Sequence, residues 1–268
     1  MKEKREEWAK KLWEKAREGW TARTDDLKYR ANVSRPALKE EISKIESEKG
    51  VCIIEFGCGD GTETLELANY LNEKNITGEI IAYDPQSQLL EKTKNENKKI
   101  GKIQIRFETG DFEKFKEQIT PSDILFSIYV LNDVADAQEY LLQTKELLKK
   151  GGKAIFQFVH PAFVEAMIKK KVAKLESSLS DIQTMTVQYP ILEKQNYFYL
   201  PVFNRKEQTY KSLLEEIGFE IESIKELIPL QNSHSRKEVP IFYTSQKNIY
   251  FPEMNQIPST MQITAHKK

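Results

Sequence analysis

The run EFGCGDG is the segment whose residue types and spacing most suggest chemistry. It places Gly57 and Gly59 directly after an apolar stretch and directly before an amphipathic one. Glycine permits a tight turn and close approach of a ligand to the backbone, and N–H groups at a helix N-terminus attract polar or anionic groups. The order strand, glycine loop, helix is typical of a nucleotide site, although a packing turn without a ligand has the same pattern.

Acidic residues follow two further strand candidates. Asp84 ends EIIAYD, and Asp111 comes just after IQIRFE. A carboxylate at such a strand end accepts hydrogen bonds from both hydroxyls of a ribose, while the alternative for Asp84 is a cap on a helix that starts at Pro85. Because the carboxyl ends of parallel strands meet at one edge of a sheet, we expect these residues and the glycine loop to line one crevice.

Two other kinds of nucleotide site are disfavoured. The third glycine of the dinucleotide fingerprint G-x-G-x-x-G falls on Thr62, which argues against a nicotinamide-dependent dehydrogenase. The loop also lacks the pattern G-x-x-x-x-G-K-[ST], so nucleoside triphosphate chemistry is not supported.

The segment from Val51 to Val159 has the alternation of a parallel sheet covered by helices. Its strand candidates are VCIIEF, EIIAYD, IQIRFE, DILFSI and AIFQFV. Apolar residues spaced near 3.6 predict the helices between them, and Gly151–Gly152 is predicted to cap the helix before the fifth strand. After residue 204, KEQTYKSLLEEIGF predicts a helix, and FEIESIKEL and STMQITA predict strands.

Two flanking regions are candidates for a lid. The charged residues 1–49 contain a helix with tryptophans on one face, which either docks on the core or walls a pocket. Residues 161–204 are predicted to hold a Lys-rich helix, AFVEAMIKKKVAKLE, and an aromatic cluster that either lines a pocket or packs the helix on the core. We therefore divide the chain into a helical lid segment, 1–49, and one α/β domain, 50–268, with an inserted lid at 161–204 and an irregular connection at 229–258.

Composition excludes several classes of protein. Of the 268 residues, 39% are hydrophobic and 31% charged, which is typical of a globular chain. The formal net charge of +0 gives no global attraction to nucleic acid or an anionic membrane. The two cysteines and three histidines form no zinc-ligand pattern, so no metal is expected. The longest uncharged stretch, residues 254–266, is too polar and too short to span a membrane. The N-terminal residues lack the apolar core of a secretory signal peptide. Together these features predict a cytoplasmic protein.

Taken in order, these motifs resemble the class I S-adenosylmethionine-dependent methyltransferases. The resemblance rests on EFGCGDG, YDPQ, GDF and SIYVLND between residues 51 and 159. More loosely, the runs at 35–37 and 160–161 and the C-terminal segments are similar to the small-molecule branch of that family. The resemblance implies an α/β, Rossmann-like sheet of seven strands in the order 3-2-1-4-5-7-6, with STMQITA as the antiparallel last strand, helices on both faces and a helical and aromatic lid.

The resemblance also implies S-adenosyl-L-methionine as cofactor and S-adenosyl-L-homocysteine as product. Glu55 and the glycines would contact the methionine part, Asp84 the ribose and Asp111 the adenine amino group, with Phe112 beside the ring. The full set of implied cofactor residues is Glu55, Gly57, Cys58, Gly59, Asp84, Pro85, Asp111, Phe112, Ser127, Ile128, Tyr129 and Arg35. We expect Cys58 to be a small packing residue without a redox role.

Methyl transfer from a sulfonium mainly requires alignment, exclusion of water and, where needed, removal of one proton. His160 and Tyr29 are the candidates for that proton, and His160 alternatively caps a helix before Pro161. The candidate substrate-pocket residues are Trp20, Tyr197, Tyr199 and Arg205.

The leading hypothesis is methyl transfer to an O or N atom of a small molecule or short peptide, such as a specialised metabolite. RNA or protein methylation is the alternative among enzymes, and the neutral composition disfavours it. A regulatory subunit that binds the cofactor without turnover is the alternative from another class.

Overall fold

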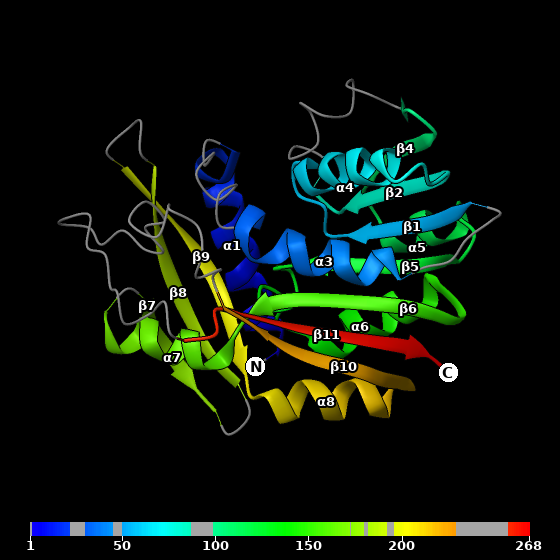
Figure 1. Ribbon diagram of the computed structural model, residues 1–268. Coiled ribbons are helices and arrows are strands. Elements are labelled where there is room, and N and C mark those ends of the chain that lie inside the picture. Colours follow the sequence, from blue (N-terminus) through cyan, green and yellow to red (C-terminus); the bar gives the residue numbers. More distant parts are fainter. Residues whose placement is uncertain are drawn as a thin grey trace.

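The computed structural model describes residues 2–21, 30–44, 50–86, 99–171, 173–179, 182–191, 196–228 and 257–268 (Figure 1). The helices are α1 (Lys2–Thr21), α3 (Ser34–Ser43), α4 (Thr62–Glu73), α5 (Phe112–Glu117), α6 (Ala137–Glu146), α7 (Pro161–Lys169) and α8 (Glu207–Glu216). The strands are β1 (Val51–Phe56), β2 (Gly78–Asp84), β3 (Lys99–Ile100), β4 (Ile103–Thr109), β5 (Ser122–Ile128), β6 (Leu148–Val159), β7 (Ala173–Ser178), β8 (Ile182–Ile191), β9 (Asn196–Arg205), β10 (Phe219–Leu227) and β11 (Thr260–Lys267).

The central sheet has the strand order β10-β11-β6-β5-β1-β2-β4-β3. The pairs from β6 to β4 are parallel, whereas β11 is antiparallel to both β6 and β10. The seven strands predicted from the sequence therefore have the predicted order and the predicted antiparallel strand. The short β3 extends the sheet beside β4. The predicted fold class is confirmed.

The register of the parallel strands brings their polar ends to one edge. Phe56 lies opposite Tyr83, Asp84 lies opposite Thr109, and Glu55 lies opposite Phe126 of β5. The loops that follow β1, β2, β4 and β5 consequently leave the sheet side by side.

Successive residues along the strands pack into two cores, one on each face of the sheet. Ile53 packs with α3 and α4, and its neighbour Ile54 packs with α5, α6 and α8. This alternation follows from the two-residue period of a strand. Both faces are covered by helices, as predicted.

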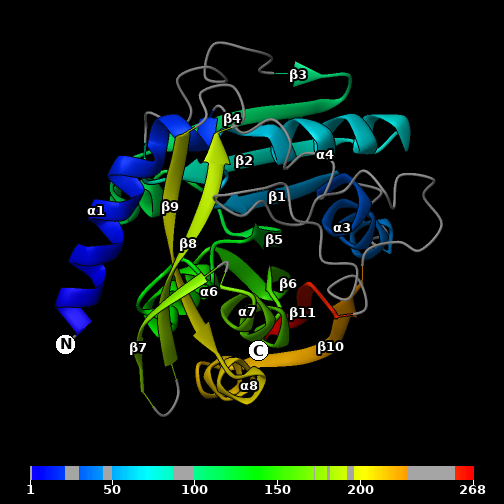
Figure 2. The ribbon, with the colours of Figure 1, turned by 90° about the vertical axis from the view of Figure 1, so that its left-hand side faces the viewer.

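A separate antiparallel sheet of three strands, β7-β8-β9, stands beyond the edge toward which β1, β2 and β6 run (Figures 1 and 2). We call it the small sheet. The helix α1 packs on β9, where the rings of Trp8 and Phe203 meet edge to face at 5.8 Å. The two roles predicted for the tryptophan helix are docking on the core and walling a pocket. Trp8 docks the helix, but it does so on the small sheet and not on the core of the central sheet.

The structure corrects two predicted boundaries. The Lys-rich helix ends at Lys169, because Lys171 takes a left-handed conformation (φ +59°) and Ala173 begins β7. The aromatic cluster lies on strands β8 and β9, which were not predicted, although aromatic residues favour strands. Gly151–Gly152 does not cap α6, which ends at Glu146; Gly151 (φ +74°) lies in a bulge of β6, where the register with β5 shifts.

Most of the predicted irregular connection, residues 229–256, lies outside the described residues. Within the described part, no helix combines the length and apolar composition needed to cross a membrane.

Candidate active site

The glycine loop is packed against the loop that follows β5. Gly57 has φ +85°, and a Cβ atom there would lie 2.4 Å from the Val130 side chain, so a larger residue does not fit. The N–H groups of Gly57 and Cys58 both donate to the Tyr83 carbonyl oxygen, at 2.8 and 3.0 Å. These two N–H groups are therefore used within the protein, and what Gly57 contributes is close approach to the backbone.

Glu55 is a buried carboxyl group at the end of β1. It is 2% exposed and accepts a hydrogen bond from the Thr64 hydroxyl in the first turn of α4. Burial raises the pKa of Glu55 well above its usual range. Because a buried carboxylate is stabilised by a cation, the position suits the ammonium group of a bound amino acid. Burial also raises the pKa of the neighbouring Cys58 thiol, which fits a packing role.

Asp84 joins the second strand to the glycine loop. Its Oδ2 accepts from the Gly59 N–H at 3.0 Å, and its Oδ1 accepts from the Gln86 N–H at 2.8 Å. Each carboxylate oxygen has two lone pairs, so each retains one acceptor position for a hydroxyl group. Burial raises the pKa of Asp84 to about 6. Pro85 follows it and is exposed.

Asp111 caps α5 at the end of β4. Its carboxylate accepts from the Lys114 N–H at 3.2 Å, and the side chain is exposed. Phe112 packs on Phe56, with ring centroids 5.8 Å apart. The cap uses one carboxylate oxygen, so the second is available for a donor such as the adenine amino group.

Ser127 and Ile128 end β5 within the core. The Ser127 hydroxyl lies 2.6 Å from that of Tyr140, which donates to the Phe56 carbonyl oxygen at 2.9 Å. Because the single hydroxyl proton of Tyr140 is used in the bond to Phe56, Ser127 is the donor in the pair with Tyr140. The Ser127 side chain thereby helps to hold α6 against the sheet. Ile128 is 6% exposed and packs under α3 and α4. Because the side chains of Ser127 and Ile128 are engaged in the core, only their backbone groups are available to a ligand at the sheet edge.

Tyr129 has a left-handed backbone (φ +58°), which costs about 1–3 kcal/mol in a non-glycine residue. Its N–H donates to the Gln157 carbonyl oxygen at 2.7 Å. Its hydroxyl lies 2.6 Å from that of Ser34 and 2.8 Å from that of Thr260. The ring is thereby fixed between α3 and β11 at the site edge.

The structure corrects the role expected for Arg35. Its Nε and one Nη donate to the two carboxylate oxygens of Glu63, at 2.7 and 3.0 Å, and the side chains of both residues are buried. The planar guanidinium is therefore used in a two-pronged pair that fastens α3 to the start of α4. Arg35 positions the site rather than offering a free cation to the cofactor.

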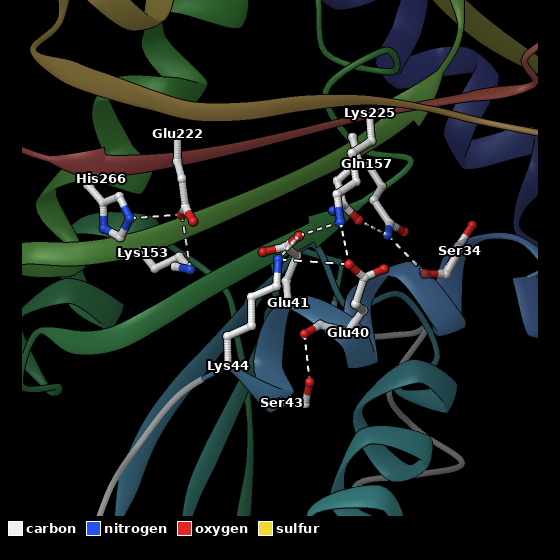
Figure 3. A network of polar contacts seen from close by, with 11 residues as sticks. Ser34, Glu40, Glu41, Ser43, Lys44, Lys153, Gln157, Glu222, Lys225 and His266 are labelled. Atoms are coloured by element: carbon white, nitrogen blue, oxygen red, sulfur yellow. Dashed lines mark hydrogen bonds and ion pairs between the residues drawn. The ribbon is translucent and has the colours of Figure 1, made fainter.

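Further polar contacts hold α3 on the sheet (Figure 3). Glu41 is fully buried and pairs with Lys225 at 2.7 Å and with Lys44 at 2.8 Å. The Gln157 amide donates to the Ser34 carbonyl oxygen at 2.9 Å. The pair with Lys225 holds the C-terminal half of α3 on β10, and the bond from Gln157 holds the helix start that carries Ser34 and Arg35.

His160 is a helix cap and not the proton acceptor that was one of the two predictions for it. Its Nδ1 accepts from the Ala162 N–H at 3.1 Å in the first turn of α7. Its Nε2 lies 3.2 Å from a carboxylate oxygen of Glu226 and is therefore the protonated nitrogen. Since Nδ1 is occupied and Nε2 carries the proton, the ring has no lone pair left for a substrate.

Replacing His160 with alanine should lower the free energy of unfolding by about 1 kcal/mol, because the cap and the contact with Glu226 are lost. His160→Asn keeps a capping acceptor and should lose less. Thermal unfolding of both variants measures this. A variant with normal stability but weakened ligand binding would return His160 to the list of site residues.

Arg205 is also corrected, because it is 5% exposed and bonded to main-chain carbonyl groups. It donates to the carbonyl oxygens of Val134 and Ala135, at 2.9 and 2.7 Å, in the loop after β5. It therefore shapes this loop instead of lining a pocket. Tyr199 is 45% exposed on β9. Tyr29 and the side chains of Trp20 and Tyr197 lie outside the described residues.

Two residues without a predicted role also belong to this edge, Asn132 and Asp133. The Asn132 amide donates to the Asp133 carboxylate, and burial raises the pKa of Asp133 well above its usual range. Their position directly after a strand that ends at this edge of the sheet was the available signal.

Comparison with known proteins decides the family. Residues 47–218 match the family model described as methyltransferase domain. The chain belongs to this methyltransferase family. The protein is an S-adenosylmethionine-dependent methyltransferase, as the order of its motifs predicted. No curated protein sequence matches the chain.

Several solved structures share the fold of this methyltransferase. One is the methyltransferase in complex with the Trm112 methyltransferase activator of Haloferax volcanii, with a TM-score of 0.61, 14% identity, and 95% and 96% of the two chains covered. Another is an S-adenosylmethionine-dependent methyltransferase from Mesorhizobium loti, with a TM-score of 0.55, 18% identity, and 87% and 96% covered. A third is the DhpI–SAM–HEP complex, with a TM-score of 0.54, 14% identity, and 96% and 94% covered.

The pH dependence of nucleoside binding should reflect Asp84. In the binding mode expected from the sequence, ionised Asp84 would accept hydrogen bonds from the ribose hydroxyls, so its protonation as the pH falls through about 6 would remove acceptor capacity. The affinity for 5′-methylthioadenosine, which has the ribose but no titrating amino acid, should fall about tenfold between pH 7 and pH 5. Calorimetry measures this. Asp84→Asn should flatten the profile, and an unchanged profile in this variant would contradict the assignment.

Proposed function

We propose that this methyltransferase transfers the methyl group of S-adenosylmethionine to an O or N atom of a small molecule or short peptide. The observation that carries this proposal is the covering of the sheet edge. The Phe203 N–H of β9 donates to the Asn132 carbonyl oxygen at 2.7 Å, so the small sheet is bonded to the loop after β5. With α1 packed on β9, α1 and the small sheet would act as a lid over this edge, which suits a small acceptor (Figure 2).

The residues of the edge fit the cofactor. Buried Glu55 would hold the ammonium group of the methionine part, and Asp84 would accept from the two ribose hydroxyls. Asp111 would accept from the adenine amino group beside Phe112. Gly57, Gly59 and the backbone of Ser127 and Tyr129 would allow close approach. When bound, the cofactor supplies a methyl group on a positively charged sulfur, and the protein aligns the acceptor and excludes water.

Two other functions stay open to test. A solved structure with the same fold forms a complex with a methyltransferase activator, and another is a complex with SAM and a further ligand, so the fold serves different partners. RNA or protein methylation needs a basic or groove-like surface, which the formal net charge of +0 does not favour. A cytoplasmic location stays a prediction from the sequence.

The test is the release of S-adenosylhomocysteine from S-adenosylmethionine with three separate acceptor pools: metabolites below about 1 kDa, peptides, and RNA. We expect turnover with the first or second pool. Turnover only with RNA would favour the RNA alternative, and binding of the cofactor without turnover in any pool would favour the regulatory subunit.

A further inference from the structure

A carboxylate outside the residues proposed to hold the cofactor lies in the loop that follows β5, at the same edge of the sheet. Val130 packs directly on Gly57, so the loop after β5 touches the glycine loop. Asp133 lies three residues further along this loop and is half-buried. The Asn132 amide donates to its Oδ1, while Oδ2 accepts no hydrogen bond from the residues that the structure describes.

The loop that carries Asp133 is held from several sides. Asn132 accepts the Val159 N–H on its side chain at 3.3 Å and the Phe203 N–H on its carbonyl group at 2.7 Å. The Asp133 N–H donates to the Val130 carbonyl oxygen at 2.7 Å. Arg205 donates to the carbonyl oxygens of Val134 and Ala135, the two residues that follow Asp133. These bonds fix the carboxylate before any ligand arrives, as a reacting group requires.

We propose that Asp133 accepts the proton that the methyl acceptor loses, so the acceptor is an O–H or N–H group. This inference rests on the proposed function. A bond forms between the acceptor atom and the methyl carbon, the carbon–sulfur bond breaks, and its electron pair goes to sulfur. The proton moves from the acceptor to Oδ2 of Asp133, which turns the carboxylate into a carboxylic acid as the sulfonium becomes a neutral thioether.

The surroundings of Asp133 suit this role. Burial raises the pKa of Asp133, which makes its carboxylate a stronger base, while the nearby charge of Arg30 favours the ionised form. Arg30 lies over the Tyr129 ring at 5.6 Å, so it also sits at the site edge.

The test compares two ligands that differ at the reacting position and needs no acceptor. Sinefungin has an amine-bearing carbon where the cofactor has its methyl-bearing sulfur, and S-adenosylhomocysteine has an uncharged sulfur. In Asp133→Asn, sinefungin should bind about tenfold more weakly, and S-adenosylhomocysteine should bind as in the wild type. The reason is that only sinefungin has an ammonium group at the reacting position, where it would pair with the Asp133 carboxylate. Calorimetry of both ligands with each variant gives the ratio.

Asp136→Asn is the matched control, because Asp136 lies in the same loop and caps α6 through the Glu139 N–H at 3.0 Å, a role that asparagine also fills. Its ratio should equal that of the wild type. Equal losses for both ligands in Asp133→Asn and in a second variant, Asp133→Ser, would show a structural role and overturn the proposal. An unchanged ratio would overturn it as well. A wild type that binds neither ligand would instead refute the proposed function, and this inference with it.

Discussion

Replacing Asp84 with alanine should weaken S-adenosylmethionine binding by about 1.5–3 kcal/mol, roughly ten- to a hundredfold, because two charge-assisted hydrogen bonds to the ribose are lost. The structure adds a second reason. Asp84 accepts from the Gly59 N–H, so its removal also releases the glycine loop from the end of β2. The effect is measured by calorimetric titration at pH 7.5.

Glu79→Gln provides the control for this experiment. Glu79 lies near the opposite end of β2, half-buried beside Arg106, and should leave binding unchanged. The affinity for 5′-methylthioadenosine should fall by the same factor as that for the cofactor in Asp84→Ala, since both ligands have the ribose. Equal binding by variant and wild type would refute the ribose role.

Deleting residues 259–268 should abolish cooperative folding. This segment contains β11, which pairs with β6 on one side and β10 on the other, so its loss leaves two strands without a partner. Met261, Ile263 and Ala265 are fully buried in one core. Losses of about 2–5 kcal/mol for each large core side chain, added to the lost pairing, exceed the net stability of about 5–15 kcal/mol of a typical domain.

Point variants in β11 test how much individual side chains of this strand contribute to the free energy of unfolding. Ile263→Ala should lower the free energy of unfolding by about 2–5 kcal/mol. His266→Ala, at a half-buried position that contacts Glu222, should change it by less than about 1 kcal/mol. Denaturant unfolding followed by circular dichroism compares them. A truncated protein with an unaltered melting curve would contradict the place of β11 in the sheet.

The central sheet could be predicted because local patterns encode it. β-Branched runs that end in Glu55–Phe56, Asp84 and Thr109 marked the strands, and the family resemblance supplied their order. The small sheet was missed because the helical spacing of apolar residues continues past the end of α7. Nothing in the sequence marks the left-handed residue, Lys171, that follows this helix. The glycines at 151 and 152 were misassigned, because a bulge and a helix cap both require a left-handed residue.

The gathering of Glu55, Asp84 and Asp111 at one edge of the sheet could be predicted in the same way, because these residues stand at or just after strand ends. Their roles toward the cofactor stay predictions. The wrong assignments involve pairs far apart in the sequence. Arg35 is occupied by Glu63 on another helix, His160 contacts Glu226, and Arg205 binds carbonyl groups in the loop after β5. No periodicity shows such contacts, because they arise only once the elements pack.

The most direct test of the central claim is calorimetric titration of the purified protein with S-adenosylmethionine and, separately, with NADH. Micromolar binding of S-adenosylmethionine alone is the expected result. Binding of NADH without S-adenosylmethionine would contradict the assignment of Glu55, Asp84 and Asp111 to a methyltransferase site.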